Sequence, residues 1–259
     1  MNGFSFGRIL KQKVLAVQEF TDLLLRAGKH LYTRPRYVVD TLLQMDIIGV
    51  GSVPVVILTG FFTGSVLALQ TYRTLSGFGE VALMGQVVAL SLVRELGPVL
   101  TALMVAGRTS SGIASEIGSM LVSEQIDAMR ALGTDPLRKL VTPRLYATLV
   151  TLPLLTILCD FCGMLGGYFV SSYTAHLTAD EYWTSAYQTL TFNDVVQGLI
   201  KPFFFAVVIA LVGCYYGLHT RGGTEGVGRS TTQAVVVASV SILVLDFFIT
   251  KFLIGIRFA

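Results

Sequence analysis

The chain has 259 residues, of which 53% are hydrophobic and only 14% are charged, and its mean hydropathy is +0.69. Soluble domains carry about 25% charged residues, so this composition excludes an ordinary soluble protein and indicates an all-α integral membrane protein. The net charge of +3 is small, and we expect no nucleic-acid partner.

Three cysteines, all in apolar segments, give no disulfide framework. Cys159 and Cys162 form a C-x-x-C sequence around Asp160, within a segment that is otherwise apolar enough to be a membrane helix. We therefore expect them to serve in helix packing rather than as a redox motif or a metal site.

The N-terminal segment, residues 1–40, is basic and has apolar residues at helical spacing. This pattern predicts an amphipathic helix that lies on the cytoplasmic surface of the membrane. The alternative is a basic arm in solvent. A cleavable signal peptide is not expected, because residues 1–36 lack a continuous apolar core.

Residues 41–259 are predicted to form a single membrane domain with five apolar segments long enough to span a bilayer. Arginine and lysine residues gather between the second and third segments, which places that loop in the cytoplasm, the N-terminus on the same side and the C-terminus in the periplasm. The predicted spans are residues 47–72, 81–107, 145–173, 195–219 and 231–256.

Small residues recur every four positions in the first span, at Gly60, Gly64 and Ala68. Such a stripe lets another helix approach closely. The alternative is a lipid-facing stripe that has no partner helix.

The second span contains Arg94 and Glu95 between two uncharged runs. A charge at this depth is costly, so the pair indicates either a substrate pathway or a structural clamp. Pro98 has no N–H, so the carbonyl of Arg94 loses its helical partner and the helix should bend or open there. Neighbouring residues point in different directions on a helix, so Arg94 and Glu95 should have different partners.

Residues 116–133 mix apolar and charged side chains and end at Gly133, which can close a helix. They are predicted to form one short amphipathic helix between two spans. The residues expected to couple this segment to a partner subunit are Glu116, Met120, Glu124, Asp127, Met129 and Arg130.

Asp160, Lys201 and Asp246 are further charged residues inside the predicted spans, and Lys251 lies close to the outer end of the fifth span. At about 1.5 Å per residue, Lys201 and Asp246 lie at similar depths below the outer ends of their helices. A long lysine side chain can bridge the remaining difference, so we predict a buried Lys201–Asp246 pair. In the alternatives, Lys251 pairs with Asp246, or each residue meets water or backbone.

Several strings together resemble one family, the MlaE/YrbE permeases of MCE-type lipid transport systems. The resemblance covers roughly residues 40–255. Its most specific strings are LSLVRELGPVLTALMVAGRTSSGIASEIGSM, which starts at Leu90, and EQIDAMRALGTDPLRKLVTPR, which starts at Glu124; LPLLT, GVGRSTTQAVV and LDFFIT follow.

This resemblance implies an ABC transporter permease in the inner membrane, which acts as a homodimer with a cytoplasmic ATPase subunit and docks against an MCE-domain protein that carries lipid. Residues 116–133 match the family's coupling helix. Arg94 and Glu95 match polar residues near the lipid cavity, Lys201 and Asp246 match charged membrane positions, and Asp160 has no counterpart. In such a dimer the Gly60 and Gly64 stripe would line the interface or the cavity.

The leading hypothesis is therefore a non-catalytic lipid permease, whose substrate is phospholipid and whose ATP is used by a partner subunit. Under this hypothesis, Arg94→Ala impairs transport more than assembly. An ion- or proton-coupled carrier is the alternative, and it leaves residues 116–133 unexplained. A membrane-embedded enzyme is disfavoured, because no nucleophile–base or metal-binding signature occurs, and no cofactor is expected on this chain.

Overall fold

The computed structural model describes residues 18–25, 28 and 37–257. All regular structure in these residues is helical, and five helical segments are long and apolar enough to cross a membrane. The predicted all-α membrane fold is confirmed. Residues 18–25 are helical, but most of the predicted interfacial segment 1–40 lies outside the described residues.

The elements in chain order are α2 (Val38–Ile48), η1 (Val50–Ser52), α3 (Val53–Ser76), η2 (Val81–Leu83), α4 (Met84–Ser91), η3 (Leu92–Leu96), α5 (Gly97–Val122), α6 (Gln125–Ala131), η4 (Leu137–Val141), α7 (Thr142–Thr174), α8 (Ala179–Thr189), α9 (Phe192–Leu218) and α10 (Gly223–Arg257). The five candidate spans are Val38–Ser76, Val81–Val122, Leu137–Thr174, Phe192–Leu218 and Gly223–Leu253.

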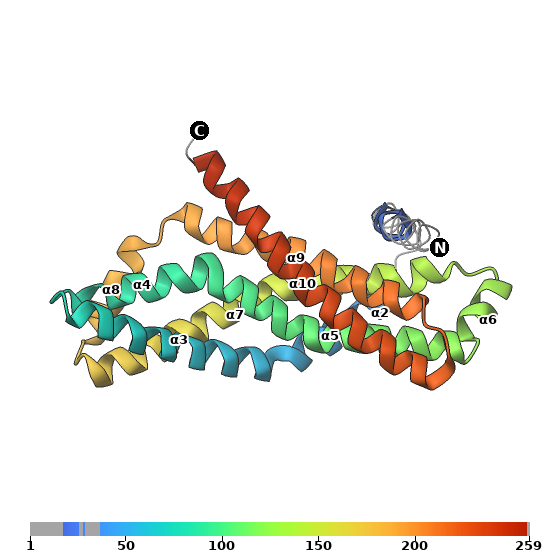
Figure 1. The fold of residues 1–259 in the computed structure, drawn as a ribbon, viewed down its shortest axis with the longest axis horizontal. Helices are drawn as coiled ribbons and strands as arrows, with labels where there is room; N and C mark the ends of the chain where they lie inside the picture. The colour runs from blue at the N-terminus through green and yellow to red at the C-terminus, as the bar shows by residue number, and fades with distance from the viewer. Residues whose placement is uncertain (1–17, 26–27, 29–36, 258–259) are drawn as a thin grey trace, which may run out of the picture.

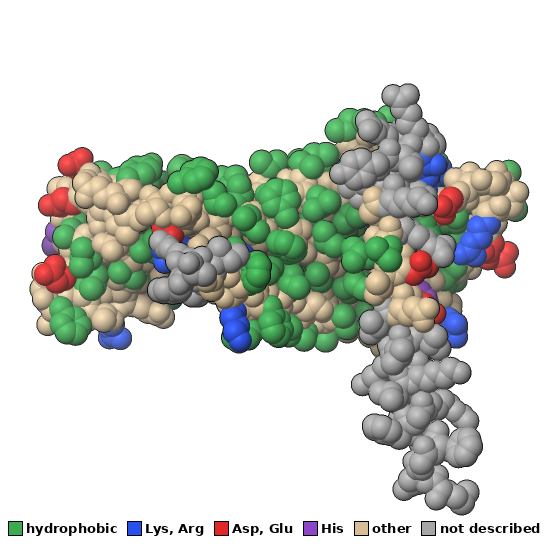
Figure 2. Space-filling model, turned by 90° about the horizontal axis from the view of Figure 1, so that it is seen from above, with side chains coloured by type: hydrophobic (Ala, Val, Ile, Leu, Met, Phe, Trp, Pro, Cys, Tyr) green, Lys and Arg blue, Asp and Glu red, His purple; other side chains and the backbone are tan. Residues whose placement is uncertain are grey.

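The helices form an elongated bundle, with α8 at one end and α6 at the other (Figure 1). The long helix α10 crosses the front of the bundle at an angle, and its C-terminal end projects beyond the other helices. Hydrophobic side chains cover the middle of the face drawn in Figure 2, and most charged ones lie toward its two ends. This distribution suits a protein that crosses a bilayer between the α8 end and the α6 end.

The prediction of one helix over residues 116–133 is wrong. Helix α5 continues to Val122, and the short helix α6 starts only at Gln125, after Glu124 in the left-handed conformation with φ 58°. The reason lies in contacts with α9, because Ile113 and Ile117 are buried and stay packed against that helix. The second span is thus longer than predicted.

The first span is not one continuous helix. Helix α2 ends at Ile48, the 3-10 turn η1 follows, and α3 begins at Val53. The span also starts earlier than the predicted residue 47. Pro54 lies in the first turn of α3, where a missing N–H costs nothing. The segment between the predicted spans 195–219 and 231–256 is shorter than expected, because α10 already begins at Gly223; Gly222 and Gly223 both have positive φ.

The small-residue stripe of the first span faces α7 in the same chain. A Cβ at Gly60 would lie 2.6 Å from the carbonyl oxygen of Cys159, and one at Gly64 would overlap the backbone of Gly163. Ala68 is fully buried. The expected close approach therefore exists, but its partner is α7 of this chain and not a second copy or a cavity.

Candidate functional site

Arg94 and Glu95 lie on η3, a turn with π-helical hydrogen bonding that joins α4 to α5. The N–H of Gly97 donates to the carbonyl of Leu92, five residues earlier. Pro98 follows in the first turn of α5. The helix disturbance expected near Pro98 thus takes the form of a π turn, a feature that is frequent at functional sites.

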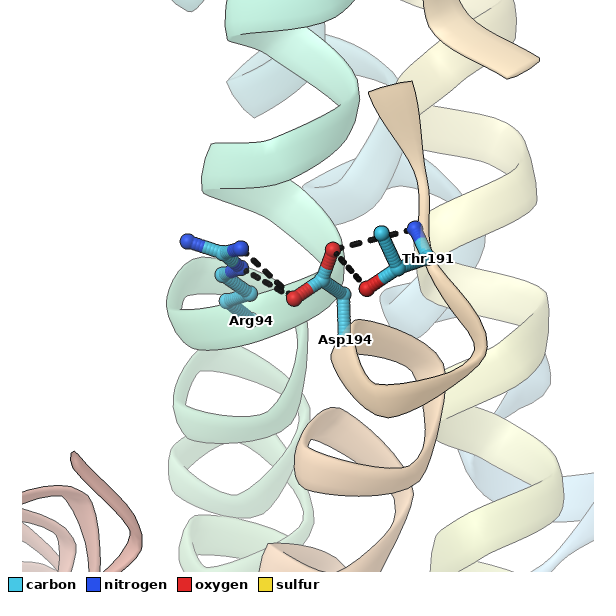
Figure 3. Close-up of polar contacts among 3 residues, drawn as sticks. All are labelled: Arg94, Thr191 and Asp194. Carbon is cyan, nitrogen blue, oxygen red and sulfur yellow. Dashed lines mark hydrogen bonds and ion pairs between the residues drawn. The ribbon is translucent and has the colours of Figure 1, made fainter. Parts of the chain in front are cut away.

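Arg94 points from η3 toward the start of α9 and binds Asp194 there (Figure 3). Its Nε and Nη2 donate to Oδ1 of Asp194 at 2.9 and 2.6 Å. The other carboxylate oxygen, Oδ2, accepts hydrogen bonds from the N–H and the hydroxyl of Thr191 at 3.0 and 2.7 Å. The Asp194 side chain is 0% exposed and that of Arg94 is 34% exposed, so the pair fixes the N-terminus of α9 against the π turn.

Glu95 forms an ion pair with Lys201, which lies about two turns after Asp194 on α9. Oε2 of Glu95 is 2.5 Å from Nζ of Lys201, and Oδ1 of Asp246 on α10 is 3.1 Å from the same Nζ. The hydroxyl of Thr250 also donates to Glu95, at 3.4 Å. The predicted Lys201–Asp246 pair is therefore present, and Glu95 completes a three-helix ionic cluster that we call the Lys201 cluster (Glu95, Lys201, Asp246).

The Lys201 cluster is buried on one side and open on the other. Lys201 is 1% exposed, whereas the side chains of Glu95 and Asp246 are 45% and 19% exposed. Both carboxylates line a cavity of about 430 Å³. The cavity is completed by Leu243, Phe247, Thr250 and Lys251.

This cavity combines charge with an apolar wall. Its two lysines and two carboxylates, counting Lys201 behind Glu95, offset one another, so the site has ionic groups of both signs and no net charge of its own. Phe247 and Leu243 stay largely exposed on the α10 side. A molecule with a polar head and an apolar chain fits this arrangement, because each part finds matching surface.

Asp160 lies apart from this cluster, on the other side of the π turn. Its Oδ1 is buried and has no hydrogen-bond partner within residues 37–257. It packs on Gly97, where a Cβ would overlap the carboxylate. Among the described residues, no ion pair joins Asp160 to the Lys201 cluster, so the structure does not bring it into the cavity.

The residues expected to couple to an ATPase occupy the opposite end of α5 from the π turn. Glu116 forms an ion pair of 2.8 Å with the buried Arg144 of α7. Asp127 and Arg130 pair with each other at 2.8 Å on the exposed side of α6. Met120 and Met129 are half-buried against the nearby apolar core, and Glu124 supplies the turn between α5 and α6.

Two partners in these contacts, Asp194 and Arg144, were not predicted from the sequence. The spacing Thr191-x-x-Asp194 is a helix-start pattern, and it could have placed the Asp194 carboxylate at the first turn of α9. Nothing in the sequence around Arg144 indicates its pairing with Glu116.

Comparison with known proteins gives the same family along most of the chain. The family profile described as "Permease MlaE" matches residues 41–252. A probable ABC transporter permease protein of Rickettsia typhi is 45% identical over 219 residues, which cover 85% of each chain. The intermembrane phospholipid transport system permease protein MlaE of Haemophilus influenzae is 38% identical over 213 residues, or 82% of each chain.

A plant relative extends the comparison to chloroplasts. The protein TRIGALACTOSYLDIACYLGLYCEROL 1 of Arabidopsis thaliana is 39% identical over 213 residues, which cover 82% of this chain and 61% of that one. The family match covers nearly all of the five candidate spans, including the π turn and the Lys201 cluster. This chain belongs to the MlaE permease family of ABC transporters, and it is a multi-pass membrane protein.

Proposed function

We propose that this chain is the membrane subunit of an ATP-driven phospholipid transporter, which moves lipid between the inner membrane and a periplasmic carrier with an MCE domain. The observation that carries the proposal is the cavity beside the Lys201 cluster, in which ionic groups at membrane depth adjoin the exposed apolar side of α10. The phospholipid transport named for the Haemophilus influenzae relative supports the choice of substrate.

Lys201 is the residue best placed to respond to a lipid phosphate. An ammonium group has three donors, and two carboxylates already compete for this one. A phosphate that enters the cavity offers Lys201 and Lys251 a new anionic partner and frees Glu95 or Asp246. Exchange of partners at one buried cation would couple lipid binding to the relative positions of α9, α10 and the π turn.

The energy comes, in this proposal, from ATP hydrolysis in a separate subunit. The chain has no G-x-x-x-x-G-K-[ST] sequence of its own. The partner ATPase would contact α6 and the end of α5, through Glu116, Met120, Glu124, Asp127, Met129 and Arg130. Helix α5 is about 39 Å long, with the π turn at its N-terminal end and α6 beyond its C-terminal end, so it can transmit a displacement of α6 to the cavity.

A second copy of the chain would complete the site. Helix α10 has the smallest buried fraction of the five candidate spans and exposes Val236, Val240, Val244 and Phe248. Two chains that meet along α10 would enclose the cavity and leave room for two acyl chains. The α6 end then faces the cytoplasm together with the N-terminus, and the C-terminus faces the periplasm.

Reconstitution tests this function directly. The chain is incorporated into vesicles with its ATPase, and transfer of a fluorescent phospholipid to the purified MCE-domain carrier is followed with and without ATP. We expect transfer in either direction to require ATP and to fail with a hydrolysis-deficient ATPase. Transfer driven by a pH gradient in the absence of ATP would instead support an ion-coupled carrier and would overturn the proposal.

A further inference from the structure

Arg108 lies on α5, within the second candidate span, and its charge has no evident counter-ion. No aspartate or glutamate in the described part of the chain forms an ion pair with it, in contrast to Arg94, which binds Asp194. A guanidinium is positively charged at any physiological pH. An uncompensated charge within a membrane span costs at least a few kcal/mol, so an anionic partner from outside the described chain would stabilise Arg108.

The guanidinium is held in one orientation by the break in the first span. Its Nη1 donates to the carbonyl oxygen of Ile47 at 3.0 Å, at the end of α2, and to the hydroxyl of Ser52 at 3.2 Å. A Cβ at Gly51 would lie 2.6 Å from Cζ of Arg108, so the group rests directly on a residue that has no side chain. These contacts occupy Nη1, while Nε and Nη2 make no hydrogen bond within the described residues.

The helix end offers only part of the missing negative charge. The carbonyl end of a helix is equivalent to roughly half an elementary charge, whereas a phosphate diester carries a full one. A guanidinium binds phosphate oxygens through two parallel N–H groups, and this geometry suits the remaining donors of Arg108.

Arg108 is exposed, and its surroundings are those of a surface that meets lipid. Three apolar side chains of the adjoining elements are exposed: Ile47 of α2 (49%), Val50 of η1 (64%) and Met104 of α5 (38%). Toward the α6 end, α5 carries Ser111, Ser115 and Ser119 at helical spacing, and none of these hydroxyls is buried. A polar row thus leads from the end of the membrane span to Arg108.

We propose that Arg108 binds the phosphate of a phospholipid whose head group lies between α2 and α5, at a site separate from the cavity beside Lys201. The ligand class is an anionic phospholipid from the leaflet on the α6 side. This proposal does not depend on the transport function, because a bound lipid would compensate Arg108 whether or not it is carried further.

Quenching by brominated lipid tests the proposal in the full-length protein. The chain has one tryptophan, Trp183, on α8. A reporter is made with Trp183→Phe and Ile47→Trp, which places the fluorophore beside Arg108. Vesicles of dioleoylphosphatidylcholine then receive either dibrominated phosphatidylglycerol or dibrominated phosphatidylcholine. We expect phosphatidylglycerol to be preferred about fivefold, the ratio that corresponds to one basic residue near the membrane surface.

Three variants identify the source of that preference. Arg108→Gln should abolish it, and Gly51→Ala should weaken it, because the new methyl group displaces the guanidinium without removing the charge. Arg73→Gln, which removes an exposed arginine at the far end of α3, should leave it unchanged. If Arg108→Gln does not fold, Gly51→Ala still decides the question.

The opposite outcomes would overturn the site. A preference that survives in both Arg108→Gln and Gly51→Ala would assign it to another residue. Absence of quenching by either brominated lipid would mean that protein, for example a second copy, covers Arg108. Loss of the preference when phosphate replaces chloride at constant ionic strength would indicate a soluble anion instead of a lipid head group.

Discussion

Arg94 and Glu95 are neighbours on one π turn, yet they belong to two different settings. Arg94 binds a fully buried carboxylate that also holds the first turn of α9. Glu95 shares Lys201 with Asp246 at the wall of a cavity. Two adjacent charges at the same depth can therefore have different roles. Arg94 positions a helix, and Glu95 belongs to an ionic cluster whose members can exchange partners.

The largest expected effect on stability comes from the Arg94 side. Asp194→Ala leaves Arg94 unpaired and removes the carboxylate that bonds Thr191, so the free energy of unfolding should fall by about 3–5 kcal/mol. Thermal unfolding in detergent and size-exclusion chromatography measure this change. Arg94→Ala should act in the same direction, because it leaves the fully buried carboxylate of Asp194 without its cationic partner. Unchanged stability in Asp194→Ala would remove the structural half of the comparison.

A glycine substitution tests the close contact between α9 and the π turn, which links the Arg94–Asp194 pair to the Lys201 cluster. Gly198 lies on α9 between Asp194 and Lys201, and a Cβ there would overlap the carbonyl oxygen of Val93 on the π turn. Gly198→Ala should therefore cost about 1–3 kcal/mol of unfolding free energy through overpacking. Gly107→Ala on α5 is the matched control, since nothing lies within 4 Å of its added Cβ, and it should be neutral or stabilising. Equal behaviour of the two variants would contradict the close contact.

Lys201→Met should separate stability from transport. Removing this buried cation leaves two carboxylates that are partly exposed and can be hydrated from the cavity, which reduces the penalty for leaving charges without a partner. We expect the unfolding free energy to change by less than about 2 kcal/mol while ATP-dependent lipid transfer is lost. Lys251→Met, at the same cavity, should lower transfer less. A fully active Lys201→Met protein would contradict the proposed role of the Lys201 cluster in lipid transfer.

On α6 the expected change in stability is smaller still. The Asp127–Arg130 pair is about 60% exposed on both sides, and exposed pairs contribute roughly 0–1 kcal/mol. Arg130→Ala should therefore leave thermal unfolding of the isolated chain unchanged but weaken binding of the ATPase, as measured by co-purification. Loss of the folded chain would show that α6 serves the fold instead.

The smallest effect concerns the far end of the molecule. Hydrogen bonds from the backbone and hydroxyl of Thr178 lower the pKa of Glu181 in the capping box of α8. Their stabilising effect is present above the ordinary glutamate pKa of about 4.3 and is lost as the pH falls through the lowered pKa. Trp183 contacts Tyr182 and Tyr187, so its fluorescence should report fraying of α8 only in that acidic range. Glu181→Gln should remove this pH dependence.

Hydropathy predicted the five spans, and helical rise predicted the Lys201–Asp246 pair, because both depend on local composition and depth. The end of α5 could not be predicted in this way. Residues 116–122 have the mixed pattern of a surface helix, but contacts between Ile117 and α9 keep them in line with α5. The partner of Gly60 and Gly64 also required the three-dimensional structure, since small residues predict a close approach without saying which helix approaches.

Parallel assay of Lys201→Met and Arg94→Gln tests the division of roles most directly. Both proteins are reconstituted with the ATPase and the MCE-domain carrier, and ATP-dependent phospholipid transfer is divided by the amount of folded complex. We predict that Lys201→Met assembles but transfers lipid at least about tenfold more slowly, a barrier increase of about 1.4 kcal/mol or more. Arg94→Gln should yield less folded complex with nearly normal transfer per complex; this reverses the expectation from the sequence, because Arg94 holds the start of α9 through Asp194. Normal transfer by Lys201→Met, together with well-folded but inactive Arg94→Gln, would contradict the account.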